Sequence, residues 1–128
     1  MSLHKSKDPY AERCPIRDVL ERTGDRWTLL VLFTLEEWGT LRFTVLRSKV
    51  QDISQRMLAQ TLRRLEQDGL VLRIVHPTVP PRVDYELTAL GKSFLVPLHG
   101  LLQWAQTHHE QVRAARSAYQ APTPAQAL

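Results

Sequence analysis

The sequence predicts a mainly helical domain that carries one small β-hairpin. Apolar residues recur at helical spacing between residues 15 and 65 and again between residues 90 and 112. Residues 70–87 are instead rich in branched side chains, and residues 83–87 alternate apolar and charged types. The proline-rich PTVPP at 77–81 separates the two halves of this region. A chain of 128 residues suits one domain with one hydrophobic core.

The two chain ends are expected to lie outside this domain. Residues 1–12 are polar, lack the apolar stretch of a secretion signal, and are expected to be flexible. Residues 116–128 are of low complexity and are expected to be disordered, so the domain covers residues 13–115. The longest apolar run, residues 29–35, is far shorter than the roughly 20 residues that span a bilayer. With a single cysteine as well, the sequence favours a cytoplasmic protein without membrane contact.

Helix boundaries in the first third follow from local signals. Pro15 suits the first turn of a helix, and the apolar residues that recur at helical spacing in it are Ile16, Val19 and Leu20. Gly24 ends this helix, and Asp25 can cap the next one. Residues 26–37 are apolar on nearly every side, which predicts a helix at the centre of the fold.

Two shorter elements are expected next. Gly39 breaks the central helix, and residues 40–43 can form a short strand leading into a short helix. The inward positions of that helix are Phe43, Leu46 and Val50.

The segment ISQRMLAQTLRRLEQDGLV, residues 53–71, predicts an amphipathic helix with an unusual outer face. Ser54 is a good N-cap and Gly69 ends the helix. At about 3.6 residues per turn, Leu58, Leu62 and Leu65 form one buried stripe. Three polar residues stand almost diametrically opposite this stripe: Arg56, Gln60 and Arg63.

A short helix, a tight turn and this amphipathic helix form the arrangement known as helix-turn-helix. Arginine can donate two hydrogen bonds to guanine, and glutamine can bridge the N6 and N7 atoms of adenine in the major groove. Met57, Ala59 or the Thr61 methyl group are candidates for contact with a thymine methyl group. Ser54 and Gln55 at the helix start are candidates for a phosphate contact. The alternative is an ordinary surface helix, in which arginine and glutamine are simply good helix formers.

The distribution of charge favours a polyanionic partner. Residues 42–82 hold eight arginine and lysine residues against three acids, whereas the remainder holds nine against ten. The positive excess therefore lies in the middle third, which holds the predicted helix-turn-helix and the first part of the hairpin. A solvated basic surface without a partner is the alternative interpretation.

The predicted hairpin, residues 72–87, follows directly on the amphipathic helix and resembles the wing of a winged helix-turn-helix fold. Arg73, His76 and Arg82 lie on it or near its tip. Arg82 is the preferred candidate for a phosphate or minor-groove contact. In the alternative interpretation Arg82 pairs with Asp84 or Glu86. Three further residues complete the set of candidate DNA contacts: Arg47, Lys49 and Arg64.

Several motifs together resemble the HxlR-type regulators, which are bacterial winged helix-turn-helix proteins related to the MarR group. The motifs are Cys14-Pro15-Ile16, GDRW (24–27), LRF (41–43), IS-R-ML--TLR-LE-DGLV (53–71) and PPRVDYELTALG (80–91), followed by a helix with Leu98 and Trp104. The resemblance covers about residues 13–106. It implies a DNA-binding transcriptional regulator that acts as a homodimer on a pseudo-palindromic operator, with half-sites roughly 34 Å apart.

The resemblance also implies how the homodimer forms. In this family the N-terminal helix and the long C-terminal helix provide the dimer contact, and the corresponding residues here are Ile16, Val19, Leu20, Leu98, Leu101, Leu102 and Trp104. Trp104 in the monomer core is the alternative interpretation. Thr88 can cap the C-terminal helix, and Pro97 is expected to kink it or split it in two. The sequence departs from the family at Asp52, where glycine is common, and in GDRW, where GGKW is common.

Several relatives sense oxidants through a cysteine at the position of Cys14. Cys14 precedes a helix start and lies between Arg13 and Arg17, which favours the thiolate. Without a second cysteine, oxidation leads to a link between two Cys14 residues, a mixed disulfide or an oxyacid. An inert thiol packed at the dimer contact is the alternative. A redox signal or a small-molecule effector is expected to change the spacing of the two recognition helices.

The remaining motifs do not support an enzyme, a cofactor or a metal site. Gly91-Lys92-Ser93 imitates a phosphate-binding loop, but Glu86 stands where its first glycine is required. No two histidines are four residues apart, and no nucleophile signature is present. The alternative function is therefore not catalytic: the same fold docks an acidic protein partner through its basic face.

Overall fold

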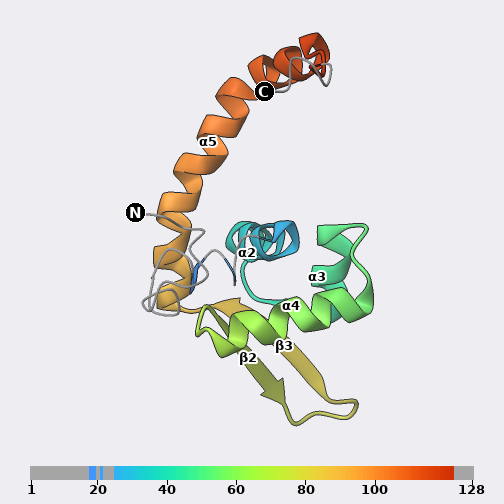
Figure 1. The fold of residues 1–128 in the computed structure, drawn as a ribbon. Helices are drawn as coiled ribbons and strands as arrows, with labels where there is room; N and C mark the ends of the chain where they lie inside the picture. Colours follow the sequence, from blue (N-terminus) through green and yellow to red (C-terminus); the bar gives the residue numbers. More distant parts are fainter. Residues whose placement is uncertain (1–17, 20, 22–24, 123–128) are drawn as a thin grey trace, which may run out of the picture. The chain divides into compact units, whose positions relative to one another are not determined.

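The computed structural model describes residues 18, 19, 21 and 25–122. The elements with described bounds are α2 (Arg26–Trp38), β1 (Leu41–Arg42), α3 (Phe43–Val50), α4 (Gln55–Gln67), β2 (Val71–His76), β3 (Arg82–Leu87) and α5 (Ala89–Ala118), shown in Figure 1. The three strands form an antiparallel sheet in the order β1-β3-β2. The predicted fold class, mainly helical with a small β-hairpin wing, is confirmed, and β1 adds a third strand to the hairpin.

The chain forms two compact units, one ending at Leu95 and the other beginning at Val96. The core of the first unit is built from α2, α3, α4 and the start of β2. Its buried apolar residues are Val31, Leu32, Leu35, Leu46, Val50, Ile53, Leu58, Leu62, Leu65, Leu70, Val71 and Leu95. The predicted inward positions of α3 are confirmed at Leu46 and Val50, while Phe43 is half-buried.

Helix α2 packs against three other elements, in agreement with its predicted central position, yet part of its apolar surface is open in this single chain. Its buried residues Thr28, Val31, Leu32 and Leu35 lie on the face that packs against α3, α4 and β3. On the remaining surface of α2, Leu30 is 44% exposed and Trp38 is 52% exposed. A helix that is apolar on every side can be enclosed within its own chain, or it can leave an apolar surface open. The pattern of apolar residues alone does not distinguish these two cases.

Side-chain caps start the helices as the local sequence predicts. Asp25 Oδ1 accepts a hydrogen bond of 2.7 Å from the backbone N of Trp27 at the start of α2. The hydroxyl of Thr88 accepts one of 3.0 Å from the backbone N of Gly91 at the start of α5. Each cap satisfies a backbone N–H that has no partner in the first helical turn.

Gly91 is needed for close packing rather than for phosphate binding. A Cβ atom at this position would lie 2.1 Å from the backbone O of Leu70. The Thr88 hydroxyl also donates to the backbone O of Gly69 at 2.6 Å. The first turn of α5 is thereby fixed against the junction of α4 and β2.

Helix α5 continues through Pro97 to Ala118, so of the two outcomes expected for Pro97, a kink or a split, the split is wrong. Proline removes one backbone donor, while the turns before and after it keep theirs. Residues 119–122 follow the helix without helical structure, and residues 123–128 of the predicted tail lie outside the described residues.

Candidate nucleic-acid interface

Helix α4 presents a polar face opposite its buried stripe. Ser54 caps the helix, because its Oγ accepts a 3.0 Å hydrogen bond from the backbone N of Met57. Leu58, Leu62 and Leu65 are buried, as predicted. Arg56 and Arg63 are exposed on the other side, and Gln60 between them is half-buried. Neither arginine has a salt-bridge partner among the residues that the structure describes, so both guanidinium groups are available for a ligand.

The other predicted contacts of α4 divide by burial. Ser54 and Gln55 are exposed at the helix start, and Arg64 is half-buried. Met57 and Ala59 are half-buried as well. Thr61 is only 3% exposed, so the expectation that its methyl group touches a base is wrong. Its position lies beside the leucine stripe on the helical wheel, which explains its burial.

The turn between α3 and α4 has an unusual backbone. Gln51 and Asp52 adopt φ values of 55° and 60°, a conformation in which glycine is the preferred residue. This conformation explains why glycine suits the position that Asp52 occupies. Asp52 is exposed and does not cap α4, because Ser54 has that role. A carboxylate therefore lies on the turn that leads into the candidate interface.

Two cations of α3 have contacts within the chain. Arg47 Nε donates to the backbone O of Ile53 at 3.4 Å, which links α3 to the turn before α4. Lys49 Nζ lies 3.8 Å from the ring centroid of Trp38, a cation–π contact. Both residues are exposed, yet each is also held by a neighbouring element.

The wing, defined here as β2, β3 and the loop between them, contains a cluster around Asp84. Arg82 Nε donates to Asp84 Oδ1 at 3.0 Å, and His76 Nε2 lies 3.1 Å from Asp84 Oδ2. The alternative in which Arg82 pairs with Asp84 is thus the arrangement found. Arg82 lowers the pKa of Asp84 below its ordinary value by donating this hydrogen bond; burial acts in the opposite direction, and His76 also lowers it. The same hydrogen bond raises the pKa of Arg82.

Strand register separates the basic residues of the wing. His76 stands opposite Arg82, and Asp84 stands opposite both Ile74 and Arg42. Side chains of directly opposed residues share a face of the sheet, so His76, Arg82, Asp84 and Arg42 lie on one face. Arg73 is exposed on the other face, opposite Tyr85. The structure thus brings Arg82 and His76 together and keeps Arg73 apart from them.

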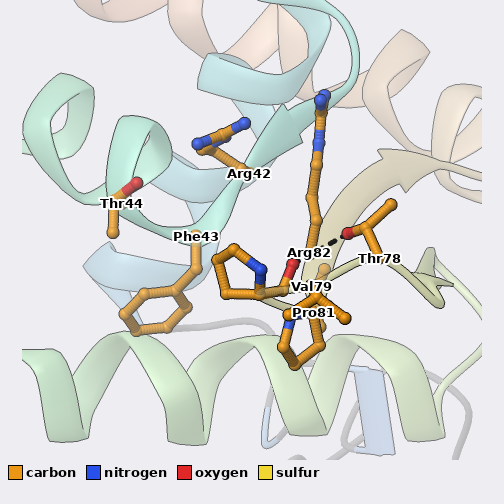
Figure 2. A pocket seen from close by; sticks show the side chains of 9 residues that line it. Arg42, Phe43, Thr44, Thr78, Val79, Pro81 and Arg82 are labelled. Atoms are coloured by element: carbon orange, nitrogen blue, oxygen red, sulfur yellow. Dashed lines mark hydrogen bonds between the residues drawn. The ribbon is translucent and has the colours of Figure 1, made fainter.

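Sequence reasoning did not single out Arg42, which lies beside the wing. Arg42, Phe43 and Thr44 line one side of a cleft of about 570 Å³, and residues 78–83 line the other. In the view of Figure 2 the Arg42 and Arg82 side chains lie above Phe43 and Pro81. Val79 at the tip of the wing is 99% exposed. The signal in the sequence was only the short strand pattern at 40–43, which does not give the strand's partner.

The unit from Val96 onward is an exposed helical segment. Its exposed apolar side chains include Val96, Leu101, Leu102 and Trp104, and Leu98 is half-buried. Trp104 is 54% exposed, and its ring stacks on that of His108 with centroids 4.8 Å apart. Val19, the one described residue of the predicted N-terminal dimer contact, is 43% exposed. Cys14, Ile16 and Leu20 lie outside the described residues.

Among the described residues, no group of three or more histidine, cysteine, aspartate and glutamate side chains is arranged to hold a metal ion. Over the same part of the chain, no helix has the length and apolar character needed to cross a membrane.

Known proteins share this sequence and fold. The sequence profile of the HxlR-like helix-turn-helix family matches residues 22–113. The HTH-type transcriptional regulator YtfH of Escherichia coli K12 is 44% identical over 112 residues, which are 88% of each chain. The structure of the transcriptional regulator ytfH from Salmonella typhimurium superposes with a TM-score of 0.74 at 43% identity, covering 86% of this chain and 97% of that one. The redox regulator HypR in its reduced form gives a TM-score of 0.73 at 31% identity, covering 79% and 99%.

Proposed function

Because this chain belongs to the HxlR-like helix-turn-helix family and is a transcriptional regulator rather than an enzyme, we propose that it binds a pseudo-palindromic operator as a homodimer. Helix α4 enters the major groove of each half-site, and the wing lies along the adjacent backbone or minor groove. The observation that carries this proposal is the face of α4 opposite its buried leucines, where Arg56 and Arg63 are exposed without ion-pair partners in the described part of the chain.

Base recognition is assigned to three side chains of α4. Arg56 and Arg63 have the donor geometry for guanine, and Gln60 between them has the donor and acceptor needed for adenine. Ser54 and Gln55 contact a phosphate at the start of α4, where unsatisfied backbone N–H groups and the helix dipole favour an anion.

Backbone contacts come from the elements flanking α4. We assign them to Arg47 and Lys49 of α3, to Arg64 of α4 and to Arg73 of the wing, whereas Arg82 of the wing contacts the minor groove or the phosphates at its edge. Arg47 is held at the turn by the backbone O of Ile53, Lys49 is held by the ring of Trp38, and both side chains remain exposed. Arg42 joins this set, because it lies beside Arg82 at the cleft between α3 and the wing.

Dimerisation is assigned to the long C-terminal helix together with the N-terminal segment. Exposed Leu101, Leu102 and Trp104 on α5 supply apolar area that a second copy can bury, with Leu98 beside them. A two-fold arrangement would set two copies of α4 about 34 Å apart, one turn of B-DNA.

The input to this regulator is proposed to be a redox signal at Cys14 or a small ligand. The fold neighbour HypR is named a redox regulator, which supports the first possibility. Thiol labelling of the wild type and of Cys14→Ser tests it: a sensing Cys14 labels faster than free cysteine at neutral pH. Labelling no faster than that of free cysteine would exclude redox sensing at Cys14 and would leave a small ligand as the proposed input.

The function is tested by selecting duplexes from random-sequence DNA with the purified protein. We expect an enriched inverted repeat that is bound by two copies of the protein. Its affinity should fall steeply as the salt concentration rises, and the slope of log affinity against log salt should correspond to several phosphate contacts. Failure to enrich any sequence, together with affinity that hardly responds to salt, would instead favour docking of an acidic protein partner by the same face.

A further inference from the structure

Three side chains near the tip of the wing form one connected cluster. Both carboxylate oxygens of Asp84 are occupied, Oδ1 by Arg82 Nε at 3.0 Å and Oδ2 by His76 Nε2 at 3.1 Å. An ionised carboxylate only accepts hydrogen bonds, so Nε2 of His76 carries a hydrogen in this arrangement. His76 and Arg82 stand opposite each other on β2 and β3, so two strands contribute to the cluster.

The cluster has its acid inside and its two basic groups at the surface. The Asp84 side chain is 7% exposed, whereas those of His76 and Arg82 are 42% and 50% exposed. Arg82 uses only Nε for the Asp84 hydrogen bond, and a guanidinium has five N–H donors. The hydrogen bond from Nε therefore orients the guanidinium group, while its Nη groups remain accessible to a ligand at the surface.

We infer that Asp84 is a positioning residue for Arg82, with His76 holding the second carboxylate oxygen of Asp84. The inference rests on the proposed function, in which Arg82 contacts DNA. Asp84 fixes the direction of the guanidinium, and His76 fixes the carboxylate from its second oxygen. A side chain held in this way loses less conformational entropy when it binds.

The test asks whether Asp84 directs Arg82, and its probe is a labelled duplex selected from random DNA by the wild type. Two versions of the duplex differ only in having A·T or G·C pairs beneath the wing, since a directed arginine prefers the narrow A·T minor groove. Asp84→Asn adds positive charge, yet it is expected to lower the A·T preference toward the value of Arg82→Ala. Circular dichroism confirms that the variants are folded.

The outcomes separate this inference from the proposed function. Wild type that selects no duplex overturns the proposed function. Wild type that binds with a steep salt slope, while Asp84→Asn keeps the same A·T preference, overturns this inference alone.

Discussion

The guanidinium of Arg82 donates from Nε to Oδ1 of Asp84 across 3.0 Å, and Asp84 is only 5% exposed. An acid is thus buried in the wing beneath the arginine that the proposed function directs to DNA. Its hydrogen bonds are therefore expected to influence both stability and binding.

Stability should fall in acid because of Asp84. Its pKa is lowered in the folded state, chiefly by the hydrogen bond from Arg82, so the unfolded chain binds its proton more readily. The resulting stabilisation is complete above the ordinary aspartate pKa of about 3.9 and is lost as the pH falls through the folded-state value. Urea unfolding from neutral pH to below about pH 4 should show a steeper loss for wild type than for Asp84→Asn. Equal losses in the two proteins would contradict this role of Asp84.

Ser54 serves both stability and binding, and two substitutions separate these roles. Ser54→Ala removes the acceptor for the Met57 N–H and should destabilise the protein by about 1 kcal/mol in urea unfolding. Ser54→Asp keeps a capping oxygen, so its stability should stay close to wild type. Its negative charge should nevertheless weaken DNA binding at the proposed phosphate contact. A Ser54→Ala protein as stable as wild type would show that the cap contributes nothing.

The left-handed turn at Gln51 and Asp52 predicts a second pair of separable effects. Gln51→Gly relieves a backbone strain of roughly 1 kcal/mol, partly offset by the greater freedom of glycine in the unfolded chain. We expect a slightly raised unfolding midpoint and unchanged DNA affinity. Asp52→Asn keeps a residue that tolerates this conformation and removes an exposed carboxylate near the interface. It should bind DNA more tightly, with unchanged stability. The opposite pattern in the two variants would mean that Asp52 does not approach the phosphates.

Local chemistry accounts for the features that the sequence predicted correctly. Ser54 and Thr88 cap helices through hydrogen bonds to residues three positions away, so the signal and the structure span the same few residues. The buried stripe of α4 follows from helical periodicity alone. The match to the family profile supports the same fold.

Features set by distant contacts were not predictable in the same way. The contact between His76 and Asp84 depends on the register of β2 against β3, and the sequence of the proline-rich loop between them does not determine this register. The position of Arg42 beside Asp84 requires β1 to pair with β3 across more than forty residues of sequence. Burial of Thr61 and exposure of Leu30 depend on how far the neighbouring elements extend over each helix.

The central claim is that the outer face of α4 recognises bases. Its most direct measurement is the binding of Arg56→Ala and Arg63→Ala to the selected duplex and to duplexes with single base changes. Arg113→Ala, on α5, is a matched control for the loss of one arginine. Each α4 variant should lose roughly 1–3 kcal/mol of binding free energy and its preference at one base pair, while Arg113→Ala keeps both. If both α4 variants bind every duplex as the Arg113→Ala control does, the outer face of α4 does not recognise DNA.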